Sequence, residues 1–304
     1  MEIREAHEKP EEMAAPAGFN LSAWEAGKRA VYAADENAAG GRPYLDSIEI
    51  QMGRTLRDQS TDLELGKADV VELGPNELRR QVAGRQVWSS SPVQVVALVF
   101  GPRVEDARVR EALALAVDRA AIHNVLLQRQ GEISGALLPQ WLSGEAFLFA
   151  PALDMAKARA LVSGLPAAAR TISLTVSDAA WKPIADRIAL NARDAGLVVP
   201  VTVQSGNADV RLVEVRLASS DPWRALAELA AELGSAAPAP PEPARAGTAE
   251  ALYGAESGLL DGFHVIPLFH LPLLFGAGAR VKGGPGVTPL GEWHFENLWV
   301  EARP

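Results

Sequence analysis

The sequence of 304 residues contains no cysteine, and that absence excludes several chemistries at once. Disulfides, thiolate zinc sites, iron–sulfur clusters and cysteine nucleophiles all require this side chain. The sequence also lacks an HExxH pair and a Gly-x-Ser-x-Gly elbow, and Gly66-Lys67 is followed by Ala68 rather than by the Ser or Thr of a P-loop. We therefore expect a protein that is not an enzyme and that holds no cofactor and no metal.

Positive charge and long apolar runs are also scarce. The chain has 29 basic against 38 acidic residues, a net charge of −9, which argues against a partner recognised through its phosphates, so no nucleic acid is expected. The apolar stretch from Val265 to Phe275 is broken by two prolines and a histidine and is shorter than the ~20 residues of a membrane span. No direct membrane insertion is expected. The charged N-terminus predicts no signal peptide in this chain, as in a cytoplasmic protein or the trimmed form of an exported one.

What the sequence does contain is a regular alternation of strand and helix patterns, which is typical of an α/β fold. Strands are expected at 19–24, 29–33, 44–52, 68–73, 94–100, 171–176, 198–203, 210–217, 265–269 and 294–300. Helices are expected at 55–65, 75–82, 105–127, 154–162, 179–195, 223–233 and 249–260. Asp118 is expected to cap a second segment of the third helix, Asp221 to cap the sixth, and Gly66, Gly164 and Gly196 to end the helices before them.

A few polar and aromatic residues are candidates for a binding site. Glu214 and Arg216 are two apart on a predicted strand and share a face, either as an ion pair on a solvated face or as the polar wall of a cleft. Trp88 precedes a loop-like Ser89–Pro92 segment and could line such a cleft, although a tryptophan is more often a core residue. His264 and His270 would share one face of a strand, but the strand offers no carboxylate to complete a metal site, so a structural role is favoured.

Several segments, in order, resemble landmarks of family 5 of the bacterial extracellular solute-binding proteins. The matching segments are FNLSAWEAGKR (19–29), GGRPYLDSI (40–48), LGKADV (65–70), VREALALAVDR (109–119), AKARALV (156–162), DP (221–222) and IPLFH (266–270). Their order and spacing together are more specific than any one of them, and the resemblance covers most of residues 19–304. The family supplies the peptide-, nickel- and oligosaccharide-binding components of ABC importers.

The resemblance implies a periplasmic-binding-protein-like type II fold with two lobes. A first lobe is expected from residues 19–74 and 265–304, which places Ala249 to Val300 in a return to the lobe that begins at Phe19. The second lobe is expected from residues 75–264, with a Pro/Ala-rich loop at 234–248. A flexible segment is expected at 1–18. The chain begins near the middle of the family's sequence, so an N-terminally truncated form is expected.

The resemblance also implies capture of a small peptide-like or other oligomeric solute by lobe closure, with ABC importer membrane subunits as partners and a periplasmic or extracytoplasmic location. The cleft wall is predicted at Val213–Ala218, and the predicted ligand-binding residues are Trp88, Glu214, Val215, Arg216, Leu217 and Ala218, with Arg216 the most useful polar group. In the family's oligopeptide binders an Asp stands at the position of Ala218 and pairs with the α-ammonium of the peptide. Its absence disfavours peptides with a free N-terminus.

Two other functions stay open at this point. The same fold can serve as the ligand-sensing C-terminal portion of a transcription regulator, which a helix-turn-helix encoded upstream would favour. The chain could also be a truncated family member that binds nothing. A thermal-shift screen of peptides, nickel and oligosaccharides separates a binder from a non-binder, because a ligand stabilises the folded state by mass action.

Overall fold

The computed structural model describes residues 16–75, 77, 82–145, 149, 153–204, 208–238, 248–284 and 286–302. The chain divides into two compact units: unit 1 comprises Met1–Ser91 and Leu273–Pro304, and unit 2 comprises Pro92–Pro272. The predicted lobe boundaries lay at residues 74/75 and 264/265, so the observed division differs at both places. It falls within two long strands, β5 (Gln86–Phe100) and β10 (Val265–Ala277), which continue from one unit into the other.

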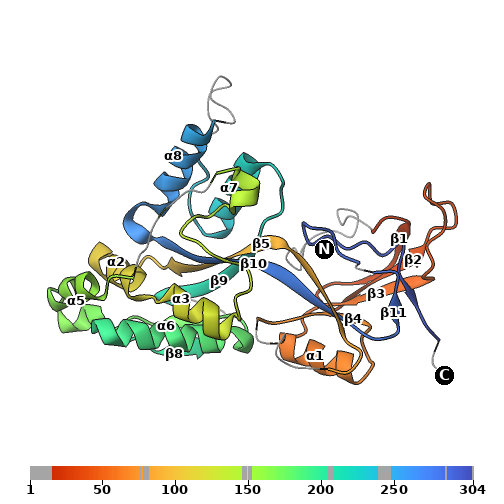
Figure 1. Ribbon diagram of the computed structural model, residues 1–304, viewed down its shortest axis with the longest axis horizontal. Helices are drawn as coiled ribbons and strands as arrows, with labels where there is room; N and C mark the ends of the chain where they lie inside the picture. The colour runs from red at the N-terminus through yellow and green to blue at the C-terminus, as the bar shows by residue number, and fades with distance from the viewer. Residues whose placement is uncertain are drawn as a thin grey trace. The chain divides into compact units, whose positions relative to one another are not determined.

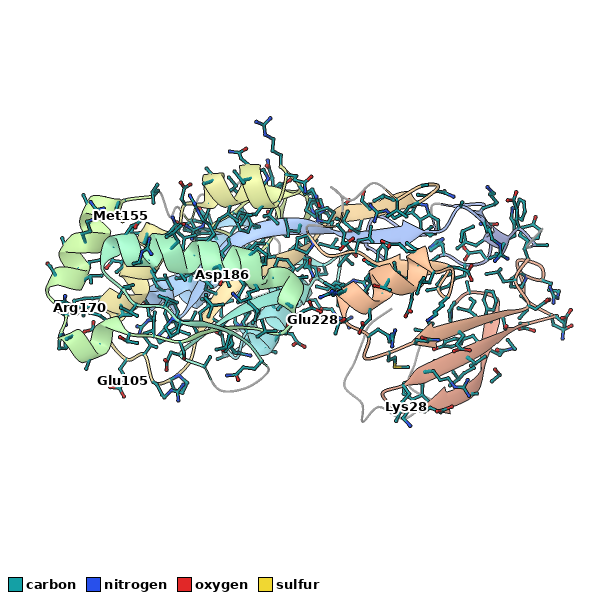
Figure 2. The ribbon with its side chains drawn as sticks, turned by 90° about the horizontal axis from the view of Figure 1, so that it is seen from below. Lys28, Glu105, Met155, Arg170, Asp186 and Glu228 are labelled. Atoms are coloured by element: carbon teal, nitrogen blue, oxygen red, sulfur yellow. The ribbon has the colours of Figure 1, made fainter. Side chains whose placement is uncertain are left out.

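Unit 1 is built on a three-stranded antiparallel sheet in the order β1-β2-β3. The predicted hairpin is confirmed, and Lys28 lies in its turn (Figure 2). The helix predicted at 55–65 is confirmed, and Gly66 follows it with φ +67°. The elements of unit 1 other than the ends of β5 and β10 are β1 (Phe19–Glu25), β2 (Arg29–Ala34), β3 (Ser47–Gln51), α1 (Leu56–Glu64), β4 (Val70–Glu72), β11 (Val281–Lys282) and β12 (Trp299–Val300).

The core of unit 1 is aromatic. Trp293 stacks on Phe295 with ring centroids 5.1 Å apart and meets the edge of Phe275 at 4.5 Å. The strand predicted at 294–300 is wrong for most of its length, since only Trp299–Val300 forms one. Phe295 and Leu298 are both buried, and the Leu298 N–H donates to the Phe295 carbonyl at 3.0 Å. A turn therefore buries two residues that are three apart, which an alternating strand cannot do.

Unit 2 is a sheet with helices on both faces. Strand order is β10-β5-β9-β7-β8, with β6 paired to β10. Helices α7 and α8 lie on one side of this sheet and α6 on the other (Figure 1). The strands other than β5 and β10 are β6 (Glu132–Ile133), β7 (Leu174–Val176), β8 (Val201–Val203) and β9 (Val210–Arg216). The α-helices are α2 (Ala107–Ala116), α3 (Arg119–Ala121), α4 (Gln140–Ser143), α5 (Met155–Ser163), α6 (Lys182–Ala195), α7 (Pro222–Glu232) and α8 (Ala249–Leu260).

The short helices of unit 2 are η3 (Ile122–Leu126), η4 (Ala167–Arg170), η5 (Ala179–Trp181) and η6 (Asp261–Phe263), of which η3 is a π-helix. The predicted caps are confirmed: the Asp118 carboxylate accepts from the Ala121 N–H, and the Asp221 carboxylate accepts from the Arg224 N–H. Gly196 ends α6 with φ +96°, as predicted. The helix predicted at 75–82 and the segment 1–18 lie mostly outside the described residues, as does much of the 234–248 loop.

Small side chains let three helices of unit 2 pack closely. Ala116 of α2, Ala158 of α5 and Ala195 of α6 form one buried contact cluster. The neighbouring main core packs α2 and α6 against β5 and β9, because their large apolar side chains share one face of the sheet. Interaxial distances depend on the residues at the contact, so alanine permits the closest approach.

Two buried arginines hold α2 and the start of α3 to the rest of unit 2. The Arg110 guanidinium donates to the carbonyls of Gly262 and Val104, both at 2.7 Å. The Arg119 guanidinium donates to the carbonyls of Pro267 and Ala114, at 3.3 and 3.2 Å. Burial lowers the pKa of Arg119 to about 10, so it remains charged at neutral pH. Backbone carbonyl oxygens accept hydrogen bonds from both guanidinium groups. Both arginines therefore stabilise the fold of unit 2.

A buried carboxylate and a buried imidazole hold the loop before α4. Glu256 of α8 is fully buried and accepts the N–H groups of Leu137 and Leu138. His270 of β10 is 2% exposed, and its Nε2 lies 3.1 Å from the Leu137 carbonyl. His264 is exposed and precedes β10, so the expectation that both histidines share a strand face is wrong. Burial raises the pKa of Glu256 to about 7 and lowers that of His270 to about 4.

The raised pKa of Glu256 predicts a pH-dependent stability. Between about pH 4.5 and pH 7 the unfolded chain loses this proton while the folded chain retains it, so the free energy of unfolding falls as the pH rises. Glu256→Gln keeps an acceptor for the two N–H groups but has no proton to lose. We expect this variant to match the wild type near pH 4.5 and to exceed its free energy of unfolding by on the order of 2 kcal/mol at pH 8, measured by urea denaturation.

Glu250→Gln is the matched control, because it removes the same charge from an exposed position on the same helix. It is expected to retain the pH dependence of the wild type. An equal decline with pH in the wild type and in Glu256→Gln would contradict the role assigned to Glu256.

A second prediction concerns the close approach of β10 to Gly131. This glycine has φ +65°, and a Cβ at its position would lie 2.1 Å from the His270 carbonyl oxygen. Gly144 has a similar φ of +73° with no atom within 4 Å of such a Cβ. We expect Gly144→Ala to cost about 1 kcal/mol of stability through backbone strain alone, and Gly131→Ala to cost more than about 3 kcal/mol, measured by urea denaturation. Similar losses at the two positions would contradict the packing described.

Candidate functional site

Strand β9 places most of the predicted site residues, and its two edges are paired over different lengths. Its whole length pairs antiparallel with β5, from Val210 opposite Phe100 to Arg216 opposite Gln94. Its other edge pairs parallel with β7 only from Val210 to Leu212. Within the described part of unit 2, no strand pairs with this second edge beyond Leu212. The strand therefore continues for four residues past the end of β7.

The hydrogen bonds of the ladder show which backbone groups face that edge. The Leu217 N–H donates to the Val93 carbonyl at 2.7 Å, so the backbone groups of Val215 and Val213 also point toward β5. The backbone groups of Glu214, which alternates with them, point toward the second edge. An edge of this kind can accept an extended chain by strand addition.

Glu214 also carries the most perturbed carboxyl group at this strand. Its Oε1 accepts a hydrogen bond from the Ser177 hydroxyl at 3.2 Å. Its Oε2 is buried and has no hydrogen-bond partner among the described residues. Burial raises the pKa of Glu214 to about 7; the Ser177 hydrogen bond opposes this rise, and the charge of Asp178 adds to it.

A hollow of about 640 Å³ opens beside Glu214, within unit 2. This volume is in the range of small-molecule sites. Its polar lining includes Thr175, Ser177, Gln204 and the exposed side chain of Arg211. The remaining lining residues are Val99, Phe100, Gly101, Pro102, Ala208, Leu212, Val213, Leu233 and Gly234. These hydroxyl, amide, carboxyl and guanidinium groups can bind a ligand non-covalently, by hydrogen bonds and by charge.

The predicted site residues divide between the two units. Glu214, Val215 and Arg216 are half-buried on β9, Leu217 is a core residue, and Ala218 is exposed. Trp88 lies in the core of unit 1, 6% exposed, where the positions of Gly284 and Gly286 leave no room for a Cβ beside its ring. The loop expected at Ser89–Pro92 is wrong, because these residues belong to β5. This burial does not favour Trp88 as a ligand platform.

Four polar residues of the hollow were not predicted as site residues: Ser177, Thr175, Gln204 and Arg211. Ser177 had a usable signal, because it directly follows a predicted strand, and polar residues at the carboxyl ends of parallel strands often line ligand sites. Arg211 had a weaker signal in the alternation of charged and apolar residues along the predicted strand. Thr175 and Gln204 had none, since their place depends on the register of β7 and β8.

The described residues contain no cluster of three or more histidine, aspartate or glutamate side chains placed to hold a metal ion. Nor does any helix among them have the length and apolar character needed to cross a membrane.

Comparison with known proteins identifies the family of this chain and structures that share its fold. The model of the bacterial extracellular solute-binding proteins, family 5 (Middle), matches residues 5–225. No curated protein matches the chain. Among solved structures, NikA from Staphylococcus aureus in complex with Ni(L-His)2 is 14% identical with a TM-score of 0.77, and 93% of this chain covers 68% of it. A dipeptide-binding protein from Pseudoalteromonas in complex with Met-Leu is 16% identical with a TM-score of 0.75, and 93% of this chain covers 64% of it.

The oligopeptide-binding protein AppA from Bacillus subtilis, solved with a nonapeptide, is 13% identical with a TM-score of 0.71, and 94% of this chain covers 66% of it. The chain thus spans just under two thirds of the AppA chain. At these identities the structures show the fold alone, and this fold is the periplasmic-binding-protein-like α/β fold that the sequence predicted. Because the family model matches well over half of the sequence, the chain belongs to family 5 of the bacterial extracellular solute-binding proteins.

Proposed function

We propose that this chain is the solute-capturing component of an ABC importer and that it binds a peptide-like or other oligomeric solute without chemical change. Membership of the solute-binding family supports this role. So do the ligands bound in proteins with this fold, a nonapeptide in AppA and Met-Leu in the dipeptide-binding protein. The proposal includes closure of two lobes on the solute, docking on the membrane subunits of an importer, and a periplasmic or extracytoplasmic location.

The observation that carries the proposal is the second edge of β9 beyond Leu212. The edge directs the backbone groups of Glu214 away from β5, and the hollow adjoins it. An extended peptide that adds to this edge gains main-chain hydrogen bonds independent of its sequence, while the hollow receives one of its side chains or its end. We assign Val213–Ala218 as the wall of the binding site on this basis.

A thermal-shift screen tests the proposal. The probes are N-acetylated tetra-alanine (called tetra-alanine below), because Ala218 disfavours a free N-terminus, together with nickel with L-histidine and maltotriose, each over a concentration series. We expect tetra-alanine to raise the Tm by several degrees, because a ligand at about 100 times its Kd stabilises the folded state by about 2.7 kcal/mol. Tetra-alanine with N-methylated peptide bonds is the matched control and is expected to give a much smaller shift, since it cannot donate to a strand edge.

A Tm unchanged by every probe would contradict solute binding. A shift of equal size with the N-methylated peptide would contradict strand addition at β9 and leave solute binding in place.

A further inference from the structure

Strand β8 lies at the end of the sheet of unit 2, and no strand of the described residues pairs with its outer edge. Its hydrogen bonds with β7 show which backbone groups face that edge. The carbonyl of Pro200 and the N–H of Gln204 both bond to β7, at 2.9 and 3.0 Å. Because residues alternate in direction along a strand, the backbone groups of Val199, Val201 and Val203 point outward.

This outer edge lacks the features that normally prevent strand addition. Residues 197–204 contain no charged side chain. Pro200 does not block the edge, because its nitrogen lies on the side of β7. Val198 and Val203 are 57% and 43% exposed. Native edges are usually guarded by charge or covered by another element, so an edge without either favours pairing with a further strand.

Helix α6 packs beside β8 and extends this surface. Ala185 and Ala192 place one flank of α6 in the main core, toward α2. The opposite flank carries Arg187, Leu190 and Asp194, which share one side of the helix through spacings of three and four residues. Since α2 follows the interior strand β5 and α6 leads into the terminal strand β8, this flank lies on the side of the outer edge of β8.

The charges of this flank identify the partner. Arg187 and Asp194 carry opposite charges on either side of Leu190, and neither has an ion-pair partner among the described residues. A second copy of α6 that runs antiparallel to the first sets Arg187 of each copy opposite Asp194 of the other, and Leu190 opposite Leu190. The flank is therefore complementary to itself, as a two-fold interface requires.

We propose that two copies of this chain associate through β8 and α6, about a two-fold axis that passes near Val201. Antiparallel pairing then opposes Val199 of one copy to Val203 of the other, and each facing pair exchanges two hydrogen bonds. The two sheets of unit 2 become one continuous sheet. The inference is independent of the proposed function, because Val213–Ala218 takes no part in the contact.

The strand and the helix agree on the position of this axis. Helix α6 runs antiparallel to β8, because it connects two parallel strands. Val201 lies about 10 Å along β8 from Val198, and the same distance back along α6 from Ala195 is about seven residues. Val201 is thus level with a part of α6 within about one turn of Leu190. One axis therefore centres both the strand pairing and the charged flank.

Sedimentation velocity of the full chain over a concentration series tests the inference. We expect a reversible equilibrium between the 32.3 kDa monomer and its dimer. Val203→Lys adds a charge to the strand edge and is expected to raise the dimer Kd at least about tenfold, because lysine at an edge opposes strand addition. Val125→Lys makes the same change at a 57% exposed valine of η3 and is expected to leave the Kd unchanged.

A charge swap tests the helix contact and its symmetry. Arg187→Glu sets two acids opposite each other across the axis and is expected to raise the dimer Kd at least about threefold. The double variant Arg187→Glu with Asp194→Arg restores opposite charges and is expected to recover the wild-type Kd. Such a rescue requires that the two positions face each other in different copies.

Circular dichroism and the Tm show whether each variant is folded. Should Val203→Lys fail to fold, the charge swap on the outer side of α6 decides the question. A chain that stays monomeric up to about 100 μM would overturn the inference, as would a dimer that neither Val203→Lys nor Arg187→Glu weakens. Assembly beyond the dimer would also overturn it, because a two-fold contact closes at two copies.

Discussion

The seven-residue antiparallel pairing of β5 with β9 is the constraint on which the candidate site depends. This ladder fixes the direction of each backbone group along β9, and so it decides which residues face β5 and which face the opposite edge. The shorter pairing with β7 then leaves the last part of that edge without a strand partner among the described residues. Glu214 occupies this part of the strand, so the ladder places a carboxylate and an available edge together.

The buried arginines of unit 2 and Glu214 differ in what surrounds their charged groups. Arg110 and Arg119 are buried, and their guanidinium groups donate to backbone carbonyls of the same unit. Both arginines belong to the segment 109–119, one of the segments that carry the family resemblance, and the fold explains them. Glu214 differs because it lines the hollow and lies on the part of β9 that β7 does not pair with. This contrast separates residues that stabilise unit 2 from a residue that is available for a ligand.

The features of the fold that depend on local chemistry were predictable from the sequence. The hairpin of β1 and β2, the caps at Asp118 and Asp221 and the glycine after α6 were predicted because each follows from a few adjacent residues. The turn at Phe295–Leu298 was missed because burial at a spacing of three replaced the alternation expected of a strand.

The site was only half predictable for a related reason. Glu214 was a candidate from the pattern of its own strand, but its contact with Ser177 joins residues 37 positions apart. That contact exists because β7 and β9 pair in parallel in one particular register. A loop was expected at Ser89–Pro92, directly after Trp88, because the segment consists of serines and a proline, although the long strand β5 includes all of these residues. Pairing between distant strands decided both outcomes, and no local pattern encodes it.

A crystal structure of the chain with a bound peptide is the most direct test of solute capture at β9. We expect an extended peptide along the edge of β9 beyond Leu212, with hydrogen bonds of about 2.7–3.2 Å to the backbone of Glu214. A peptide bound away from this edge would contradict the assignment of β9 as the wall of the site.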